Sequence, residues 1–175
     1  TGFYTNTANI VWRRRHSGHP TNVVSLIGST NDLDGRRTVF DRASTNAGTV
    51  ALQFQNVQGV AVSNISVRGA NTGVRINDSS ALWFSRMRAV GNSSNGLDFS
   101  SCTNIRLSRV VLADNGSFGL QSVSNWVSVE SSVIWSNKRG AIMQSFGISG
   151  VSNSVLHAYG VGRYVFSMGS AATMS

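Results

Sequence analysis

The sequence contains a single cysteine, Cys102, in 175 residues. One cysteine excludes an internal disulfide and leaves the redox compartment open, so packing and hydrogen bonds alone must hold the fold together. We expect Cys102 to be a small buried hydrophobic residue without a chemical role.

Long hydrophobic runs and charged residues are also scarce. The chain has no apolar run of about 18 residues and no charged segment that leads into an apolar one, which predicts neither a membrane span nor an uncleaved signal peptide. Only 13% of the residues are charged, so serine, asparagine, threonine and glycine must carry most of the solubility. This balance is typical of secreted, β-rich proteins, and we expect a location outside the cell or on its surface.

Carboxylates are the scarcest charged groups, since 7 acidic residues stand against 15 basic ones for a formal net charge of +8. All the basic residues except Lys138 are arginine. Guanidinium groups form forked hydrogen bonds to carboxylate, sulfate or phosphate, which favours an anionic partner. A solvated basic surface without a partner explains the charge equally well, and both interpretations stay open.

What the sequence does contain is a repeat. Gly73, Gly96 and Gly119 follow one another at intervals of 23 residues, and each opens a short triplet that alternates like a strand. Gly48 and Gly140 extend the series at intervals of 25 and 21 residues. A nearly constant period of this length indicates a solenoid built from stacked units.

Two further triplets complete each period. The second lies at 60–62, 82–84, 105–107 and 127–129, and the third at 65–67, 87–89, 110–112 and 132–134. Each period then closes on asparagine, glycine or serine, which suit turns. Three short strands per turn of about 22 residues predict a right-handed parallel β-helix in which equivalent strands of successive turns pair in register.

We therefore assign the chain to the all-β class, as a single β-helix domain over 1–175. Residues 1–47 are expected to form irregular first turns with long loops, 48–166 the regular turns, and 167–175 a C-terminal tail. An antiparallel sandwich would not repeat at a constant period, and a leucine-rich horseshoe needs a helical segment in each repeat. Within the first turns we expect strands at 8–12, 22–27 and 38–41, and projecting loops at 13–20 and 31–37.

Four short motifs near the N-terminus resemble those with which pectate-lyase-like parallel β-helix proteins enter their solenoid. They are Gly2-Phe3-Tyr4, Ser17-Gly18-His19-Pro20, Ile27-Gly28 and Val39-Phe40-Asp41. The resemblance implies the β-helix fold for nearly the whole chain. It implies no single activity, because the group contains lyases, hydrolases, epimerases, phage tailspikes and surface adhesins.

Polysaccharide hydrolysis on this scaffold requires two carboxylates, one to protonate the leaving oxygen and one to activate water. No two acidic residues fall together on one face of an expected strand, which argues against a hydrolase. The acidic residues are Asp32, Asp34, Asp41, Asp78, Asp98, Asp114 and Glu130.

β-Elimination from a uronate requires a base and a cation that neutralises the uronate carboxylate. The resemblance to pectate lyases implies calcium on several acidic side chains for the cation and an arginine for the base. Arg75 and Asp98 are the catalytic candidates for this alternative, although an exposed ion pair between neighbouring turns explains them better. They belong to an outward column of Gln53, Arg75, Asp98 and Gln121, with Trp83 and Arg106 beside it on the second strands.

Calcium takes about six or more oxygen ligands, which a lone Asp98 does not supply, so no cofactor is expected unless the lyase alternative holds. Asp32 and Asp34 are candidate calcium ligands in a loop that is equally typical of a plain turn. His157 is expected in a turn after a third strand, without a role in a site.

Stacking of turns gathers arginines that are distant in the sequence into one basic patch. Met87 is expected to point inward between Arg86 and Arg88. With Trp83 as a surface for a sugar ring, the patch predicts binding of acidic polysaccharide, whereas nucleic acid is unlikely because no motif that reads it is present. The predicted glycan-binding residues are Trp83, Arg86, Arg88, Arg106 and Arg109, with Arg68 and Arg75 just below them.

The shortage of carboxylates favours a non-catalytic extracellular module with a structural or adhesive role, and a polysaccharide lyase is the alternative. No amphipathic helix precedes Gly2 and no polar cap follows Phe166 in the sequence. A β-helix has an unpaired strand edge and an open apolar cross-section at each end. We therefore also expect head-to-tail self-association, which would build a fibre.

Overall fold

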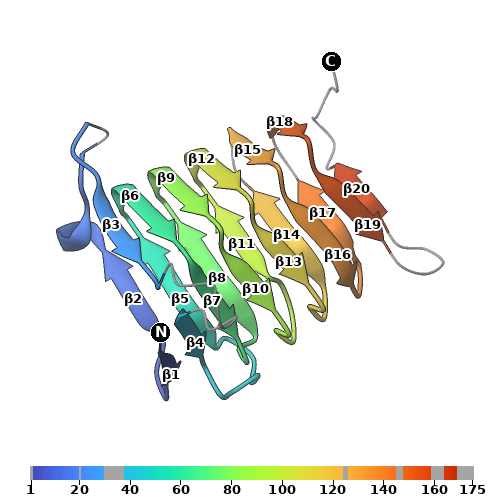
Figure 1. Ribbon diagram of the computed structural model, residues 1–175, viewed down its shortest axis with the longest axis horizontal. Coiled ribbons are helices and arrows are strands. Elements are labelled where there is room, and N and C mark those ends of the chain that lie inside the picture. Colours follow the sequence, from blue (N-terminus) through green and yellow to red (C-terminus); the bar gives the residue numbers. More distant parts are fainter. Residues whose placement is uncertain are drawn as a thin grey trace.

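A computed structural model describes residues 2–19, 21–29, 38–123, 126–144, 148–158 and 164–168. This part of the chain consists of 20 β-strands and one short 3-10 helix, η1 (Arg14–His16). The strands wind into a solenoid whose turns follow one another along the long axis, from the blue first turn to the red last one (Figure 1). None of the described helices is long and apolar enough to cross a bilayer.

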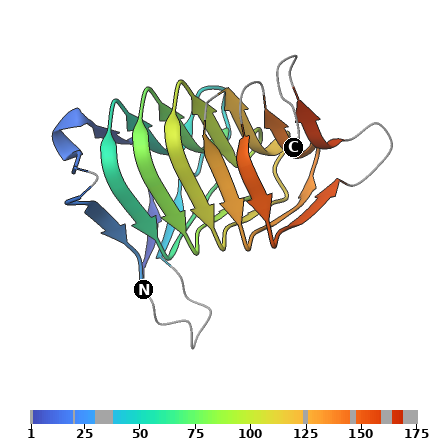
Figure 2. The ribbon, with the colours of Figure 1, turned by 90° about the horizontal axis from the view of Figure 1, so that it is seen from above.

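Three parallel sheets form the walls of the solenoid, and successive turns stack side by side (Figure 2). Sheet A consists of β1 (Phe3–Thr5), β4 (Thr38–Asp41), β7 (Ile65–Arg68), β10 (Arg88–Val90), β13 (Val111–Ala113), β16 (Val133–Asn137) and β19 (Val155–Ala158). Sheet B consists of β2 (Ile10–Arg13), β5 (Val50–Gln55), β8 (Thr72–Asn77), β11 (Leu97–Ser100), β14 (Phe118–Val123), β17 (Gly140–Gln144) and β20 (Tyr164–Met168). Sheet C consists of β3 (Val24–Ile27), β6 (Gln58–Ser63), β9 (Ser80–Ser85), β12 (Thr103–Ser108), β15 (Val127–Glu130) and β18 (Ile148–Ser152). The predicted all-β parallel β-helix is confirmed.

Alternation along each strand sends every second side chain into the solenoid. On sheet B, the inward column runs through Phe54, Ile76 and Phe99, which pair in register on successive turns and are fully buried. The ring of Phe84 from sheet C packs against Phe54 and Phe99 across the interior, at centroid distances of 5.7 and 6.5 Å. This continuous apolar interior stabilises parallel strands that no hairpin joins.

Single residues in the left-handed conformation make the sharp corners between the sheets. From sheet B to sheet C these residues are Asn56, Asp78 and Ser101, with φ of 54°, 49° and 54°. From sheet C to sheet A the corner residues of successive turns are Asn64, Arg86, Arg109, Ser131 and Asn153. Asparagine and aspartate adopt this conformation more readily than other residues with a side chain, so two arginines in the second column are unusual.

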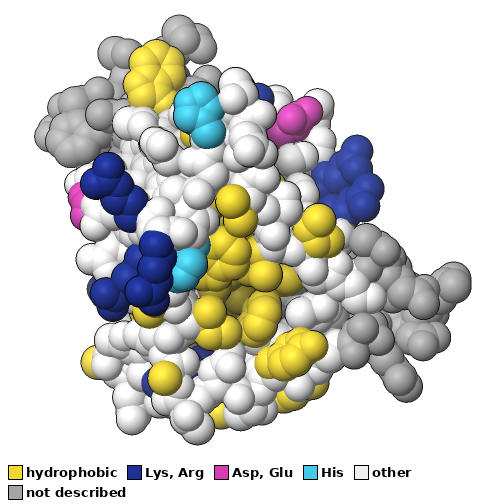
Figure 3. All heavy atoms as spheres, turned by 90° about the vertical axis from the view of Figure 1, so that its left-hand side faces the viewer, with side chains coloured by type: hydrophobic (Ala, Val, Ile, Leu, Met, Phe, Trp, Pro, Cys, Tyr) yellow, Lys and Arg dark blue, Asp and Glu magenta, His cyan; other side chains and the backbone are white. Residues whose placement is uncertain are grey.

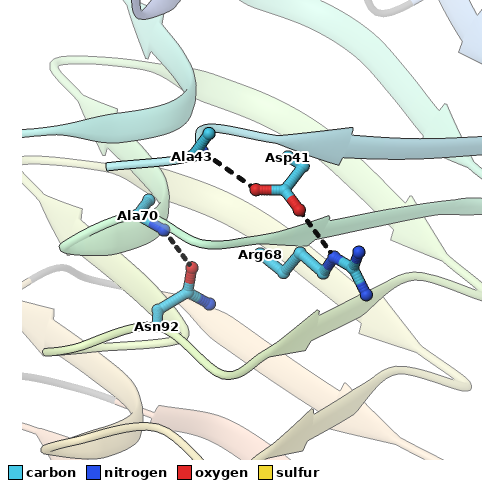
Figure 4. Close-up of polar contacts among 5 residues, drawn as sticks. All are labelled: Asp41, Ala43, Arg68, Ala70 and Asn92. Carbon is cyan, nitrogen blue, oxygen red and sulfur yellow. Dashed lines mark hydrogen bonds and ion pairs between the residues drawn. The ribbon is translucent and has the colours of Figure 1, made fainter. Parts of the chain in front are cut away.

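Buried asparagines join successive turns where the chain passes from sheet A back to sheet B. Oδ1 of Asn115 accepts hydrogen bonds from the backbone N–H and the Nδ2 of Asn92, at 3.1 and 3.0 Å. Nδ2 of Asn115 donates to Oδ1 of Asn137 at 2.8 Å and to the carbonyl of Ala89 at 3.1 Å. Asn92 extends the stack by accepting the N–H of Ala70 at 3.3 Å (Figure 4). Sequence reasoning assigned Asn92 and Asn115 to turns and missed the role of their side chains inside the solenoid.

An ion pair connects the first turns on the outside of sheet A. Asp41 of β4 and Arg68 of β7 are in register, and Nε of Arg68 lies 2.9 Å from Oδ2 of Asp41 (Figure 4). Oδ1 of Asp41 accepts the N–H of Ala43 at 2.9 Å, and the guanidinium of Arg68 lies 4.8 Å from the ring centre of Phe3. Arg68 is therefore already neutralised and does not add to the predicted basic patch.

Most predicted strands are confirmed to within two residues. The strand predicted at 38–41 is β4 itself, whereas β2 and β3 begin two residues later than the strands predicted at 8–12 and 22–27. The third strands predicted at 87–89, 110–112 and 132–134 each begin one residue later than predicted. The reason is that a buried residue such as Met87 follows the corner before strand pairing starts. Met87 points inward as predicted.

Two expectations near the C-terminus are corrected. His157 lies within strand β19 and not in a turn, because the third strand of that turn extends to Ala158. Strand β20 continues to Met168, two residues into the tail predicted at 167–175, since it pairs with β17 through Gln144. The rest of that tail and the loop predicted at 31–37 lie outside the described residues.

The first turn leaves part of the apolar interior open. Tyr4 of β1 and Val24 of β3 are in register with the inward residues Phe40 and Val60 of the next turn, and they are 53 and 37% exposed. The strands β1, β2 and β3 are the outermost strands of their sheets. Figure 3 looks onto this end and shows hydrophobic side chains gathered in the middle of the face, with Lys or Arg side chains beside them.

Candidate functional site

An open groove of about 570 Å³ lies on the outer face of sheet C, among the predicted glycan-binding residues. One side is a column of outward residues in register on successive turns, which are Trp83, Arg106, Ser128 and Gly150. The other side is the next outward column, which consists of Ser85, Ser108, Glu130 and Ser152. We call this hollow the sheet C groove.

Strand alternation and side-chain size together produce the sheet C groove. The residue between the two columns on each turn, such as Leu107 or Val129, points inward and is buried. The large side chains of Trp83 and Arg106 give way along the first column to Ser128 and Gly150. This loss of side-chain volume hollows the surface beyond the indole and the guanidinium.

Two further arginines stand at the rim of the sheet C groove. Arg86 and Arg109 each follow a serine of the second column and occupy consecutive left-handed corners, with φ of 49° and 56°. Both side chains are exposed, and Arg88 lies beyond them on the outer face of sheet A. Among the described residues, the ion pairs of arginine involve Arg68 and Arg75 and none of these three.

The catalytic candidates Arg75 and Asp98 lie on a different face, the outside of sheet B. They are in register on neighbouring turns, and Nε of Arg75 lies 3.4 Å from Oδ2 of Asp98. Nη2 of Arg75 also donates to Oγ1 of Thr72 at 3.3 Å. The predicted column is present, because Gln53 pairs with Arg75 and Gln121 with Asp98.

The surroundings of Asp98 change its acidity. Burial raises the pKa of the Asp98 carboxyl above its ordinary value, and the charge and hydrogen bond of Arg75 offset this only in part. The carboxyl therefore takes up a proton at a higher pH than an exposed aspartate. Trp83 and Arg106 do not share this environment, since they lie on sheet C beyond the corner at Asp78.

The calcium candidates Asp32 and Asp34 lie outside the described residues. Within the described ranges, no three His, Cys, Asp or Glu side chains are grouped in a way that could hold a metal ion. Cys102 is buried as predicted, with Sγ 3.1 Å from the carbonyl oxygen of Ser100.

Sequence reasoning placed Trp83 and Arg106 in the candidate site but missed Glu130, the serine column and Gly150. The repeat did hold the signal, because Ser85, Ser108 and Glu130 occupy equivalent positions of successive turns. Such outward columns are harder to recognise than inward ones, because burial does not restrict their side chains to one chemical kind.

The groups that line the sheet C groove suit a sugar chain that bears negative charge. An indole face packs against the C–H groups of a sugar ring, and a guanidinium binds carboxylate or sulfate with two parallel hydrogen bonds. Serine hydroxyls both donate and accept hydrogen bonds, and Glu130 accepts them from sugar hydroxyls. Arg106 adds positive charge within the first column, and Arg86 and Arg109 add it beyond the second column.

The fold and the groove thus define a class of protein, an all-β solenoid that carries a polar, basic groove on one wall. Residues 7–164 match the family of right-handed β-helix regions, and the chain belongs to this family. The predicted resemblance to pectate-lyase-like β-helix proteins is thereby confirmed.

One solved structure with the same fold is an alginate lyase from Paenibacillus sp. str. FPU-7, with 10% sequence identity and a TM-score of 0.50. The similarity covers 83% of this chain and 65% of the lyase, so this chain spans less than two thirds of the lyase's length. At this identity the likeness shows a shared fold alone. Among curated proteins, no match to the chain is found.

Proposed function

We propose that this protein is a non-catalytic module that binds acidic polysaccharide outside the cell, through the sheet C groove and the arginines at its rim. The observation that carries the proposal is the register of Trp83 with Arg106 inside the groove, where Arg86 and Arg109 each directly follow a serine that lines it. A stacking ring and guanidinium groups on one wall are what a negatively charged sugar chain requires.

The unbalanced charge of the rim supports an anionic partner. Arg86, Arg88, Arg106 and Arg109 come from neighbouring turns, and none of them forms an ion pair with a described carboxylate. Mutual repulsion of such groups is relieved by carboxylates or sulfates spaced along a polymer, and attraction at this surface also speeds association.

A polysaccharide lyase acting on acidic glycans is the second candidate function, and the fold that the chain shares with an alginate lyase favours it. In this case Arg75 would act as the base. A calcium ion, with Asp98 among its ligands, would neutralise the uronate carboxylate. The ion pair between the two side chains favours a structural role instead, because a base must first lose its proton and the Asp98 carboxylate stabilises the protonated guanidinium.

Binding is tested by the affinity of the full chain for immobilised polygalacturonate and for a neutral galactan. We expect retention on the acidic polymer alone, with a steep loss as salt rises, because exposed charges are screened. Arg106→Ser should weaken binding by about tenfold. Arg139→Ser removes the same charge from an exposed position outside the groove and should change binding by less than about twofold. Equal losses in the two variants would overturn the assignment to the sheet C groove.

Catalysis is tested by incubating the protein with polygalacturonate and with alginate, each with and without calcium. Elimination would release unsaturated sugars, which absorb in the ultraviolet. We expect no such product. Product formation that Arg75→Ala or Asp98→Ala abolishes would establish the lyase in place of the non-catalytic module.

We also propose that the protein associates end to end, which suits a structural or adhesive role. Among the described residues, β1, β2 and β3 each pair with a strand on one side alone, and these edges favour contact with another set of parallel strands, as do the exposed inward side chains of Tyr4 and Val24. Such a heterologous contact does not close, so it would extend into a fibre.

Sedimentation and electron microscopy over a wide concentration range test this association. We expect larger assemblies as the concentration rises, and Val24→Lys should prevent them by placing a charge over the open interior of the first turn. Val133→Lys is the matched control, since Val133 is also 37% exposed but lies on the outer wall of sheet A, on a strand that is paired on both sides. A parent protein that stays monomeric throughout would contradict the proposal.

A further inference from the structure

A second hollow, of about 740 Å³, lies between η1 and the corner that joins sheets B and C. We call it the η1 cleft. Its lining includes Arg13, Arg14, Ser17, Gln55, Gln58 and Asp78. None of the residues that line it also lines the sheet C groove, so the two hollows are separate candidate sites.

Backbone contacts fix one wall of the η1 cleft. Oγ of Ser17 accepts the N–H of Gln58 at 3.2 Å, and the N–H of Gly18 donates to the carbonyl of Gln58 at 2.9 Å. Gly59 has a φ of +61°, and a Cβ on it would lie 2.8 Å from the backbone of Gly18. The loop therefore packs directly against the start of β6, and glycine is required on both sides of this contact.

The short helix that carries Arg14 is held in a similar way. Nδ1 of His16 accepts the backbone N–H of Arg13 at 2.9 Å, and the His16 ring packs edge-on against Trp12 at 5.7 Å. Because both walls are tied to the solenoid, the cleft exists before any ligand enters it. A preformed site of this kind avoids the cost of ordering its walls on binding.

Two guanidinium groups border the η1 cleft without a described partner. Arg13 is the last residue of β2, in register with Gln55, and Arg14 begins η1. Both side chains are exposed, and among the described residues neither guanidinium forms a hydrogen bond or an ion pair. Their donor groups are available to an anion.

The carboxylate of Asp78 restricts which anion fits. Sulfate offers acceptors only, so Asp78 repels it at close range. A sugar acid carries one carboxylate for the guanidiniums and several hydroxyls that can donate to Asp78 and exchange hydrogen bonds with Gln55 and Gln58. We infer that the η1 cleft binds a carboxylated sugar unit, with Arg13 and Arg14 on the carboxylate and Asp78 on the hydroxyls. The inference holds whether or not the sheet C groove binds a polymer.

The test is a titration of the full, nitrogen-15-labelled chain with free galacturonate, galactose and inorganic sulfate, followed by NMR. Galacturonate should shift the Nε–H resonances of Arg13 and Arg14, whereas galactose and sulfate should bind at least several-fold more weakly. Arg14→Ser should weaken galacturonate binding by about tenfold. Arg15→Ser is the matched control, because Arg15 is exposed in the same run but does not line the cleft, and it should change affinity by less than about twofold.

A second variant tests the role assigned to Asp78. Asp78→Asn keeps a residue that tolerates the left-handed corner at φ 49°, and it removes the repulsion of sulfate. We expect the preference for galacturonate over sulfate to fall several-fold. Backbone amide spectra that match the parent away from the cleft verify that each variant is folded.

Several results would overturn the inference. They are the absence of galacturonate binding, equal binding of sulfate or galactose by the parent, and an equal loss in Arg15→Ser and Arg14→Ser. A loss in Arg106→Ser with none in Arg14→Ser would place the sugar in the sheet C groove, and the η1 cleft would then be rejected while the proposed function stands.

Discussion

Among single residues, Asn115 makes the densest set of buried hydrogen bonds described here. It bridges Asn92 and Asn137 and also reaches the carbonyl of Ala89. Such a stack supplies hydrogen-bond partners to buried backbone N–H and C=O groups of the turns. In the apolar interior these groups would otherwise have no partner.

We expect Asn115→Ala to lower the free energy of unfolding by about 3 kcal/mol, because buried groups on two neighbouring turns lose their partners. Asn71→Ala is the control, since Asn71 is only half-buried and its side chain makes one described hydrogen bond, to Ser93 at 3.2 Å. Asn71→Ala should lower the free energy of unfolding by about 1 kcal/mol or less. Urea unfolding measures the free energy of unfolding of both variants. Similar losses in the two would show that the asparagine stack stabilises the fold no more than an ordinary surface hydrogen bond.

Asp98 gives stability a dependence on pH whose sign follows from its raised pKa. The folded chain binds the proton more tightly than the unfolded chain. The contribution of Asp98 to stability is therefore fully present below the pKa of the unfolded chain and is lost as the pH rises through the higher pKa of the folded chain.

We expect the parent to gain stability relative to Asp98→Asn as the pH is lowered from about 7 to about 4. Urea unfolding of the two proteins at several pH values measures the difference. If the parent instead loses stability relative to the variant over this range, the charge of Arg75 outweighs burial, and the carboxyl is more acidic than an ordinary aspartate.

Among the structural elements, the corner from sheet C to sheet A links backbone strain to the proposed binding. Asn64 and Asn153 occupy this corner in two turns, and Arg86 and Arg109 occupy it in two others. A left-handed arginine costs more than a left-handed asparagine, and strain of this kind is often found at binding sites.

We expect Arg86→Asn with Arg109→Asn to raise the free energy of unfolding by about 1 kcal/mol while it weakens binding to polygalacturonate several-fold. Ser131→Asn is the control, because Ser131 lies in the same column with a φ of 51° but carries no charge. It should leave binding unchanged. Thermal unfolding and column retention measure the two effects, and unchanged binding in the double variant would remove these arginines from the site.

Across the whole molecule, stability should vary along the solenoid axis. Each strand pairs only with strands of the turns next to it, and the strands β1, β2 and β3 have a neighbour on one side alone among the described residues. Central strands such as β8 and β9 are paired on both sides and surround the buried aromatic column.

Hydrogen exchange should therefore be slowest in β8, β9, β11 and β12 and fastest in β1, β2 and β3. Mass spectrometry of peptides from a protein kept dilute enough to stay unassociated measures this gradient. Uniform protection along the chain would mean that the solenoid opens as one cooperative unit.

The sequence by itself determined the fold and the inward residues. Glycine-led triplets at a nearly constant interval reveal the register directly, since a residue one period away becomes a neighbour on the next turn. This is why the pairing of Arg75 with Asp98 and the burial of Met87 followed from spacing alone. Inward positions are restricted to apolar side chains by burial, and that restriction leaves a pattern that can be read along the chain.

Only the tertiary structure decided which outward residues share a site. Ser85, Ser108 and Glu130 do share one position of the period, but burial does not restrict outward side chains to one chemical kind, so the spacing did not mark this column as one side of the groove of Trp83 and Arg106. The η1 cleft joins Arg14 to Asp78 through a loop of the irregular first turn, where no repeat defines the register. The left-handed corners and the asparagine stack likewise arise from backbone geometry, which the identities of the residues allow but do not specify.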